Sequence, residues 1–205
     1  MPKVLQPPQE YRQPRREGKH FLLRLALRFA LTIIVVWAMA TYMEGLEMTI
    51  EDLRATVSDS ATTAPDAVIG PRAWVGPGAV VGPGATVETD AVIGPYAMVL
   101  AGAWVGPDAW IGADAWIGAG ARIGPDAWIG AGAWIEARAV MAAGAVVEAG
   151  ATIEAGATVG PDATVERGAT VEAGATVERG ATVEAGATIE AGATIEAGAT
   201  VEADE

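Results

Sequence analysis

The chain has 205 residues, which is enough for one domain of ordinary size or for one repeat array with an appendage. Cysteine is absent, which excludes disulfides, thiolate metal sites and cysteine nucleophiles, and the single histidine, His20, argues against a histidine-based metal or acid–base site. A net charge of -13 argues against nucleic acid as a partner, because phosphate binding needs clustered Lys and Arg. We therefore predict no metal, no cofactor and no nucleic-acid partner.

The first segment is a basic head. Residues 1–28 carry seven basic and two acidic residues, a net charge of +5, so the remaining chain carries −18. Residues 1–20 are rich in Pro, Gln and Arg and lack apolar periodicity, which predicts disorder.

Residues 21–43 are almost wholly apolar and are predicted to form a transmembrane helix. Twenty-three helical residues span about 34 Å, which is enough for a bilayer core. Arg24 and Arg28 lie near the start, where their side chains reach the headgroups, and Trp37 and Tyr42 complete the predicted membrane anchor. Basic residues precede the segment and acidic residues follow it, which predicts a single-pass protein with a cytoplasmic N-terminus and an extracytoplasmic C-terminal region.

Two other interpretations of this segment stay open. Ala38-Met39-Ala40 fits the small-x-small pattern of a signal-peptidase site, so the segment is alternatively a cleaved signal peptide. Arg24 and Arg28 are also four residues apart, as in a helix that lies along a surface. Residues 44–56 are predicted to be a linker with a short capping helix, because Thr49 stands three residues before Asp52.

A six-residue period governs residues 57–205. Val or Ile stands at position 57 and at every sixth residue to 201, with Thr63 and Met141 as the exceptions. Ala stands two residues before each of these positions, twenty-five times in all. From position 66 to position 204, Gly or Asp stands three residues after the aliphatic residue, except at Arg72, Tyr96 and Arg138. The period predicts three-residue strands that point Ala and Val inward, joined by corners in which Gly or Asp adopts a left-handed backbone conformation.

This array resembles the hexapeptide-repeat family, as the unit Ile153-Glu154-Ala155-Gly156-Ala157-Thr158 illustrates. The resemblance implies an all-β fold, a left-handed parallel β-helix with three hexapeptides in each of about eight coils. It also implies acyltransferase or, less often, metal-dependent carbonic anhydrase activity, both of which use histidine. Residues 57–205 contain no histidine and no inserted loop, so we predict a family fold without the family's chemistry and no catalytic residue.

The residue between Ala and the aliphatic residue points outward, and its type divides the array. It is Thr at every position from 152 to 200, and a period of 18 spreads the earlier aromatic residues over all three faces. We predict that these side chains form an interface: Trp74, Trp104, Trp110, Trp116, Trp128 and Trp134. Lateral contact between copies, as a trimer or a bundle, is favoured over contact with lipid and over stacking on sugar rings, and shielded strand residues are the simplest alternative.

Glutamates recur every 18 residues in the last part of the array, for example at 154, 172 and 190. A solvated acidic surface is the main interpretation, and a weak calcium site between stacked carboxylates is the alternative. Together these features predict a non-enzymatic, membrane-anchored β-solenoid with a structural or assembly role, which self-associates through its tryptophans. The alternatives are a polysaccharide-binding module of the cell envelope and an acyltransferase-like protein without its active site.

Overall fold

The computed structural model describes residues 55–203. These residues form twenty-five two-residue strands, each beginning six residues after the one before, and the described part of the chain contains no helix. Within it, nothing is long and apolar enough to form a membrane-spanning helix. The predicted head (1–20), transmembrane helix (21–43) and capping helix lie outside the described residues.

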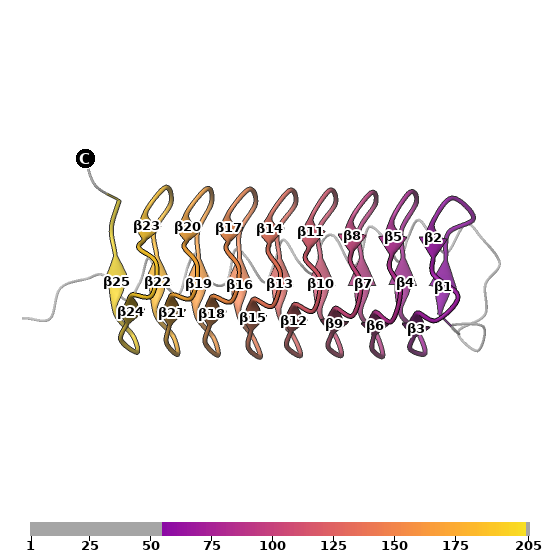
Figure 1. Cartoon of the computed structure of the whole chain (residues 1–205), viewed down its shortest axis with the longest axis horizontal. Helices are drawn as coiled ribbons and strands as arrows, with labels where there is room; N and C mark the ends of the chain where they lie inside the picture. Colours follow the sequence, from indigo (N-terminus) through magenta and orange to yellow (C-terminus); the bar gives the residue numbers. More distant parts are fainter. Residues whose placement is uncertain (1–54, 204–205) are drawn as a thin grey trace, which may run out of the picture. The chain divides into compact units, whose positions relative to one another are not determined.

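The strands belong to three parallel sheets, and Figure 1 shows the strands of each sheet following one another along the array. The first face consists of β1 (Thr56–Val57), β4 (Trp74–Val75), β7 (Val92–Ile93), β10 (Trp110–Ile111), β13 (Trp128–Ile129), β16 (Val146–Val147), β19 (Thr164–Val165), β22 (Thr182–Val183) and β25 (Thr200–Val201). The second face consists of β2 (Thr62–Thr63), β5 (Val80–Val81), β8 (Met98–Val99), β11 (Trp116–Ile117), β14 (Trp134–Ile135), β17 (Thr152–Ile153), β20 (Thr170–Val171) and β23 (Thr188–Ile189). The third face consists of β3 (Val68–Ile69), β6 (Thr86–Val87), β9 (Trp104–Val105), β12 (Arg122–Ile123), β15 (Val140–Met141), β18 (Thr158–Val159), β21 (Thr176–Val177) and β24 (Thr194–Ile195).

Every strand pairs in parallel with the strands one coil away, in a register of 18 residues. Trp110, for example, lies beside Val92 on one side and Trp128 on the other. Sheets of nine, eight and eight strands correspond to about eight coils. The predicted parallel β-helix with three hexapeptides per coil is therefore confirmed.

The core is built from one small and one branched residue per strand. From Ala73 to Ile189, all inward Ala, Val, Ile and Met side chains are at most 3% exposed. The described residues include no buried polar or charged residue and no buried side-chain polar atom without a hydrogen-bond partner. Met141 takes the aliphatic position in β15 and is as buried as its neighbours. This interior is a filled column that leaves no space for a ligand.

The three residues after each strand form a corner, here numbered as its first, second and third positions. The third position has a positive φ at every corner from Arg72 to Gly198. Pro often holds the second position, and Pro followed by a residue with positive φ is the pattern of a type II β-turn. Arg72, Tyr96 and Arg138 adopt φ values of 58°, 58° and 60°, so the three departures from Gly or Asp keep the predicted conformation.

The strands are shorter than predicted, with two residues in place of three. The inward Ala points into the core as expected, but its N–H closes the corner. The Ala97 N–H donates to the Gly94 carbonyl oxygen at 3.2 Å, and the Ala139 N–H donates to the Glu136 carbonyl oxygen at the same distance. Because this donor belongs to the turn, it is not available to the ladder, and regular pairing begins one residue later.

Candidate functional site

The six tryptophans project from all three faces of neighbouring coils, as the period of 18 predicts. The first face carries Trp74, Trp110 and Trp128, the second face carries Trp116 and Trp134, and the third face carries Trp104. We call these six side chains the tryptophan belt. Four of them are half-buried, whereas Trp128 and Trp134 are 40% and 51% exposed. The open aromatic surface therefore lies at the end of the belt that borders the threonine coils.

Contacts of the rings cover part of Trp104, Trp116 and Trp134. The Trp116 and Trp134 rings stack with centroids 5.3 Å apart and an interplanar angle of 6°. On the third face, the Trp104 indole N–H donates to Glu88 Oε1 at 3.1 Å, and the Arg122 guanidinium carbon lies 5.4 Å from the ring centroid. Trp104 thus has its polar atom paired and one ring face covered, which leaves the first two faces with the aromatic surface available to a partner.

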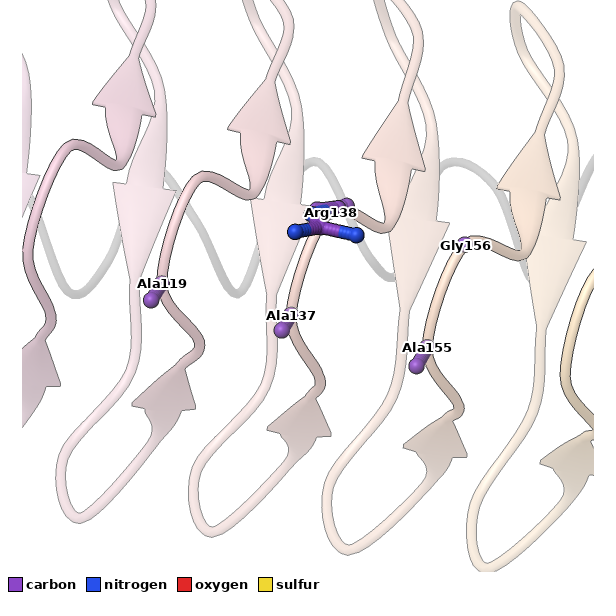
Figure 2. A pocket seen from close by; sticks show the side chains of 5 residues that line it. All are labelled: Ala119, Ala137, Arg138, Ala155 and Gly156. Carbon is purple, nitrogen blue, oxygen red and sulfur yellow. The ribbon is translucent and has the colours of Figure 1, made fainter.

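A shallow recess of about 280 Å³ lies where the second face turns into the third. Its lining includes the stacked pair Trp116 and Trp134, together with Leu100, Gly118, Ala119, Glu136 and Ala137. A second hollow of about 330 Å³ shares Ala119 and Ala137 with the first and adds Arg138, Ala155 and Gly156. Figure 2 shows the three alanines at the same place on consecutive loops, with Arg138 as the only long side chain among the labelled residues. We call the two hollows together the corner recess.

Glutamates at the first corner position have a backbone role that sequence analysis missed. One oxygen, Oε2, of Glu154, Glu172 and Glu178 accepts a hydrogen bond from the backbone N–H of Ala173, Ala191 and Ala197, respectively, at 3.0 to 3.2 Å. Each donor is the second corner residue of the next coil, a position that Pro fills at many other corners. The sequence signal for this role is a Glu that stands 19 residues before a second corner residue other than Pro, because such a residue has a backbone N–H to donate. Within residues 55–203 no group of three or more His, Asp or Glu is arranged to hold a metal ion, which leaves the calcium alternative without a site there.

One ion pair links third corner positions of consecutive coils. The Arg72 Nε–H donates to Asp90 Oδ1 at 2.7 Å, and a second guanidinium nitrogen contacts Oδ2. The hydrogen bond from Arg72 is the main cause that lowers the pKa of the Asp90 carboxyl; desolvation opposes it, and the positive charge of Arg72 adds a smaller lowering effect. The same hydrogen bond raises the pKa of Arg72. The pair joins two coils at an exposed corner and has no reactive neighbour.

The remaining predicted site residues are not placed by the structure. The membrane-anchor residues Arg24, Arg28, Trp37 and Tyr42 lie outside the described residues, as does His20. Residues 55–203 contain no histidine and no cysteine, so in this part of the chain only carboxylates are available as general bases.

Comparison with known families and structures identifies the repeat. A family described as bacterial transferase hexapeptide (six repeats) matches residues 66–101 and 126–161, and the hexapeptide repeat of succinyl-transferase matches residues 103–137. The matched segments within residues 66–161 are hexapeptide repeats of these families. A search of curated proteins finds no match to it.

Solved structures share the hexapeptide-repeat fold at low sequence identity. A UDP-N-acetylglucosamine acyltransferase is 15% identical, with a TM-score of 0.51 over 73% of this chain and 71% of that chain. The enzyme of that name from Francisella novicida is 18% identical, with a TM-score of 0.49 over 68% of this chain and 66% of that chain. A hexapeptide transferase family protein from Anaplasma phagocytophilum is 20% identical, with a TM-score of 0.33 over 71% of this chain and 72% of that chain. The chain thus spans about two thirds of the length of the Francisella enzyme, and the first of these likenesses shows a shared fold.

Proposed function

We propose that the chain is a non-enzymatic, membrane-anchored β-solenoid that assembles with copies of itself through the tryptophan belt. The observation that carries this proposal is the open aromatic surface of Trp128 and Trp134 on two adjoining faces. Large exposed apolar surfaces are uncommon on soluble monomers and usually mark contacts with a partner. A second solenoid offers a flat, parallel surface of the same kind.

The distribution of charge limits where two copies can approach each other. First corner positions are Glu at almost every corner after β16, whereas Gly holds most of these positions before β14. Two solenoids side by side would oppose their glutamates in the acidic coils, and like charges repel. Lateral contact is therefore favoured along the tryptophan belt and opposed beyond it.

Thr substitutions in the belt test self-association. Replacing Trp104, Trp110, Trp116, Trp128 and Trp134 by Thr repeats the outward residue of the later coils, so the core stays unchanged. We expect the full-length chain in detergent to form a defined oligomer by light scattering, and the variant to have a monomer's mass with its β-type circular dichroism retained. An oligomer of unchanged mass would contradict the proposal, and loss of the β signal would assign these residues to the fold.

The topology is tested separately. We propose that residues 21–43 cross the membrane once, with the basic head in the cytoplasm and the array outside it. This rests on the charge difference between residues 1–28 and the rest of the chain. Protease added to spheroplasts is expected to digest the array and to spare an epitope tag at Tyr11. Protection of the array would overturn the topology.

An acyltransferase is the second candidate function, because both of the matching repeat families are described as repeats of transferases. Under the main proposal the full-length chain transfers no acyl group from an acyl-thioester to an amino or hydroxyl sugar. Turnover above a heat-inactivated control would support the enzyme in place of the assembly module.

A further inference from the structure

We propose that the corner recess binds a sugar ring that carries a carboxylate, a hexuronate unit of an acidic glycan. In this site the open face of Trp134 stacks on the ring and Arg138 pairs with the carboxylate. The proposal shares Trp134 with the tryptophan belt, but Arg138 belongs to this site alone and the measurement is a different one, so its failure and the failure of self-association can be told apart.

Arg138 interrupts a column of glycines. After Asp66 in the first coil, the third corner positions that follow the second face are Gly at 84, 102, 120, 156, 174 and 192. Arg138 is the one side chain in this run, and it adopts the same left-handed conformation at φ 60°. Non-glycine residues in this conformation are disfavoured, and backbone strain of this kind is concentrated at functional sites.

No contact within the described residues accounts for this arginine. Arg72, another arginine at a third corner position, pairs with Asp90 in the next coil. The residue at the equivalent position one coil after Arg138 is Gly156, which has no side chain to pair with Arg138. The place that a Cβ of Gly156 would take has no atom within 4 Å. Both residues form the backbone hydrogen bonds of the coil, but neither the Arg138 side chain nor the Glu136 side chain forms a hydrogen bond or an ion pair with any other residue of the 55–203 segment. The corner recess is therefore lined by the guanidinium of Arg138 and the carboxylate of Glu136, two side chains without a partner among the described residues.

The glycines on both sides leave Arg138 room to reach the recess. The place that a Gly120 Cβ would occupy lies 3.8 Å from Arg138 Cγ, so the stem of Arg138 passes close to the preceding corner loop. Around Gly156 there is no atom within 4 Å of the corresponding place. The hollow lined by Arg138, Ala155 and Gly156 is thus open to a ligand (Figure 2).

Trp134 supplies a flat apolar surface beside this hollow. One face of its ring is covered by Trp116. The other face lies on the side of β17, where the paired residue is Thr152, a side chain too small to cover an indole. Leu100, Ala119 and Ala137 extend the apolar lining. Leu100 is itself a departure, because Gly, Glu, Ala or Ser holds the first position of every other described corner.

The chemistry of these groups matches a hexuronate. A pyranose ring has an apolar C–H face for the indole, a carboxylate for the guanidinium and hydroxyl groups that donate to Glu136 Oε atoms. A single arginine on a chain of charge -13 suits one carboxylate and not a polyphosphate. A second copy of the chain is the competing occupant, and the test below distinguishes it.

The test is isothermal titration calorimetry of the full-length chain in detergent with trigalacturonate, in the presence of EDTA. The matched control ligand is its methyl ester, which keeps the ring and removes the charge. Arg138→Gly restores the glycine of the column and so preserves the fold. Trp134→Thr introduces the residue that the next coil has at the paired position, Thr152, and so removes the indole while the strand is kept. Trp74→Thr is the control variant, because it removes a tryptophan that does not line the recess.

We expect saturable binding of trigalacturonate, weakened about tenfold or more by the methyl ester, by Arg138→Gly and by Trp134→Thr, and unchanged by Trp74→Thr. Absence of binding at millimolar ligand would overturn the proposal, and so would equal binding of the ester or of Arg138→Gly. The mass of each sample is measured by light scattering at the same time. If Arg138→Gly lowers the mass and glycan binding is absent, the recess is a contact between copies and the glycan proposal is wrong. If the glycan binds and the chain is monomeric throughout, self-association fails while this proposal stands.

Discussion

Residues 68–146 and residues 147–203 share one backbone and one core but have different surfaces. The belt half, residues 68–146, has outward Trp, Val and Met with Gly and Pro at its corners, whereas the threonine half, residues 147–203, has outward Thr with Glu and Ala at its corners. Inward residues are equally buried in both, apart from Ile69 at the start of the first half and the residues of the last coil. The same buried column thus supports two different surfaces, so the outward positions can vary without a change in the core, whereas the corner positions remain limited by backbone conformation and by the close approach of neighbouring coils.

The two halves also satisfy the same backbone group in different ways. At most corners from Asp90 onward the third N–H donates to a carbonyl of the preceding coil, as the Asp126 N–H does to the Pro107 oxygen at 3.0 Å. The second N–H has no such partner. Many corners of the belt half remove this donor with Pro, and several corners of the threonine half pair it with a Glu of the coil before.

The largest effect is expected when a corner of the belt half receives the residue of the threonine half. A Cβ at Gly130 would lie 2.4 Å from the Ala149 nitrogen, so Gly130→Glu forces the backbone of two coils apart. We expect a loss of about 1 to 3 kcal/mol in the free energy of unfolding, measured by denaturant titration of the full-length chain. Ala142→Glu adds the same charge at a first corner position that already has a Cβ, and is expected to cost far less. Equal losses would show that charge, not space, separates the two kinds of corner.

A smaller effect is expected from the stacked pair of the belt half. Trp116→Thr and Trp134→Thr, singly and together, form a double-mutant cycle on the second face. The 5.3 Å stack predicts a coupling free energy of about 0.5 to 1.5 kcal/mol. Trp74 and Trp128 are not in adjacent coils, and the same cycle on them is expected to give no coupling. Additive losses at Trp116 and Trp134 would contradict the stack.

The glutamate caps of the threonine half are expected to contribute less still. Glu172→Ala removes the acceptor of the Ala191 N–H and is expected to cost about 0.5 to 1 kcal/mol in unfolding free energy, because the bond is exposed. Ala191→Pro removes the donor, as Pro161 does in the same half of the array. In that background Glu172→Ala is expected to cost almost nothing. An undiminished cost would show that Glu172 stabilises the array by another contact.

The smallest effect concerns the pH dependence of the Arg72–Asp90 pair. Because the pKa of Asp90 is lower in the folded chain than its ordinary value of 3.8, its contribution to stability is complete above that pH and is lost as the pH falls through the folded pKa. The stability difference between the parent and Asp90→Asn should therefore shrink in melting curves recorded below about pH 4. Asp114→Asn is the control, since Asp114 has the same backbone conformation but forms no ion pair with the rest of the described array. A difference that does not change with pH would contradict the pairing.

Much of the fold followed from the sequence, because a hexad determines both burial and turn chemistry. The inward column, the left-handed corner residues and the 18-residue register were predicted, down to the departures at Arg72 and Tyr96. The strand length was not, because the period does not reveal that the Ala N–H bonds within the turn. These properties depend on local backbone geometry, which repeats every six residues.

The candidate site was predictable only as a set of residue types. The sequence placed the six tryptophans on their faces, but the open surface at Trp128 and Trp134 depends on how rings lean on neighbours in adjacent coils. That Leu100 and Trp134 line one hollow while Arg138 lines the hollow beside it likewise depends on side-chain positions across several coils. The 18-residue period predicts the face and the coil on which each residue lies, but it does not predict the direction in which a long side chain leans.

The most direct test of the central claim is electron cryo-microscopy of the full-length chain in detergent, with the subunits counted and their contacts located. The assembly proposal predicts several solenoids that meet along residues 68–146, with Trp128 and Trp134 covered, and that separate beyond residue 147. Single solenoids with both tryptophans exposed, or bundles joined through the threonine half, would contradict it.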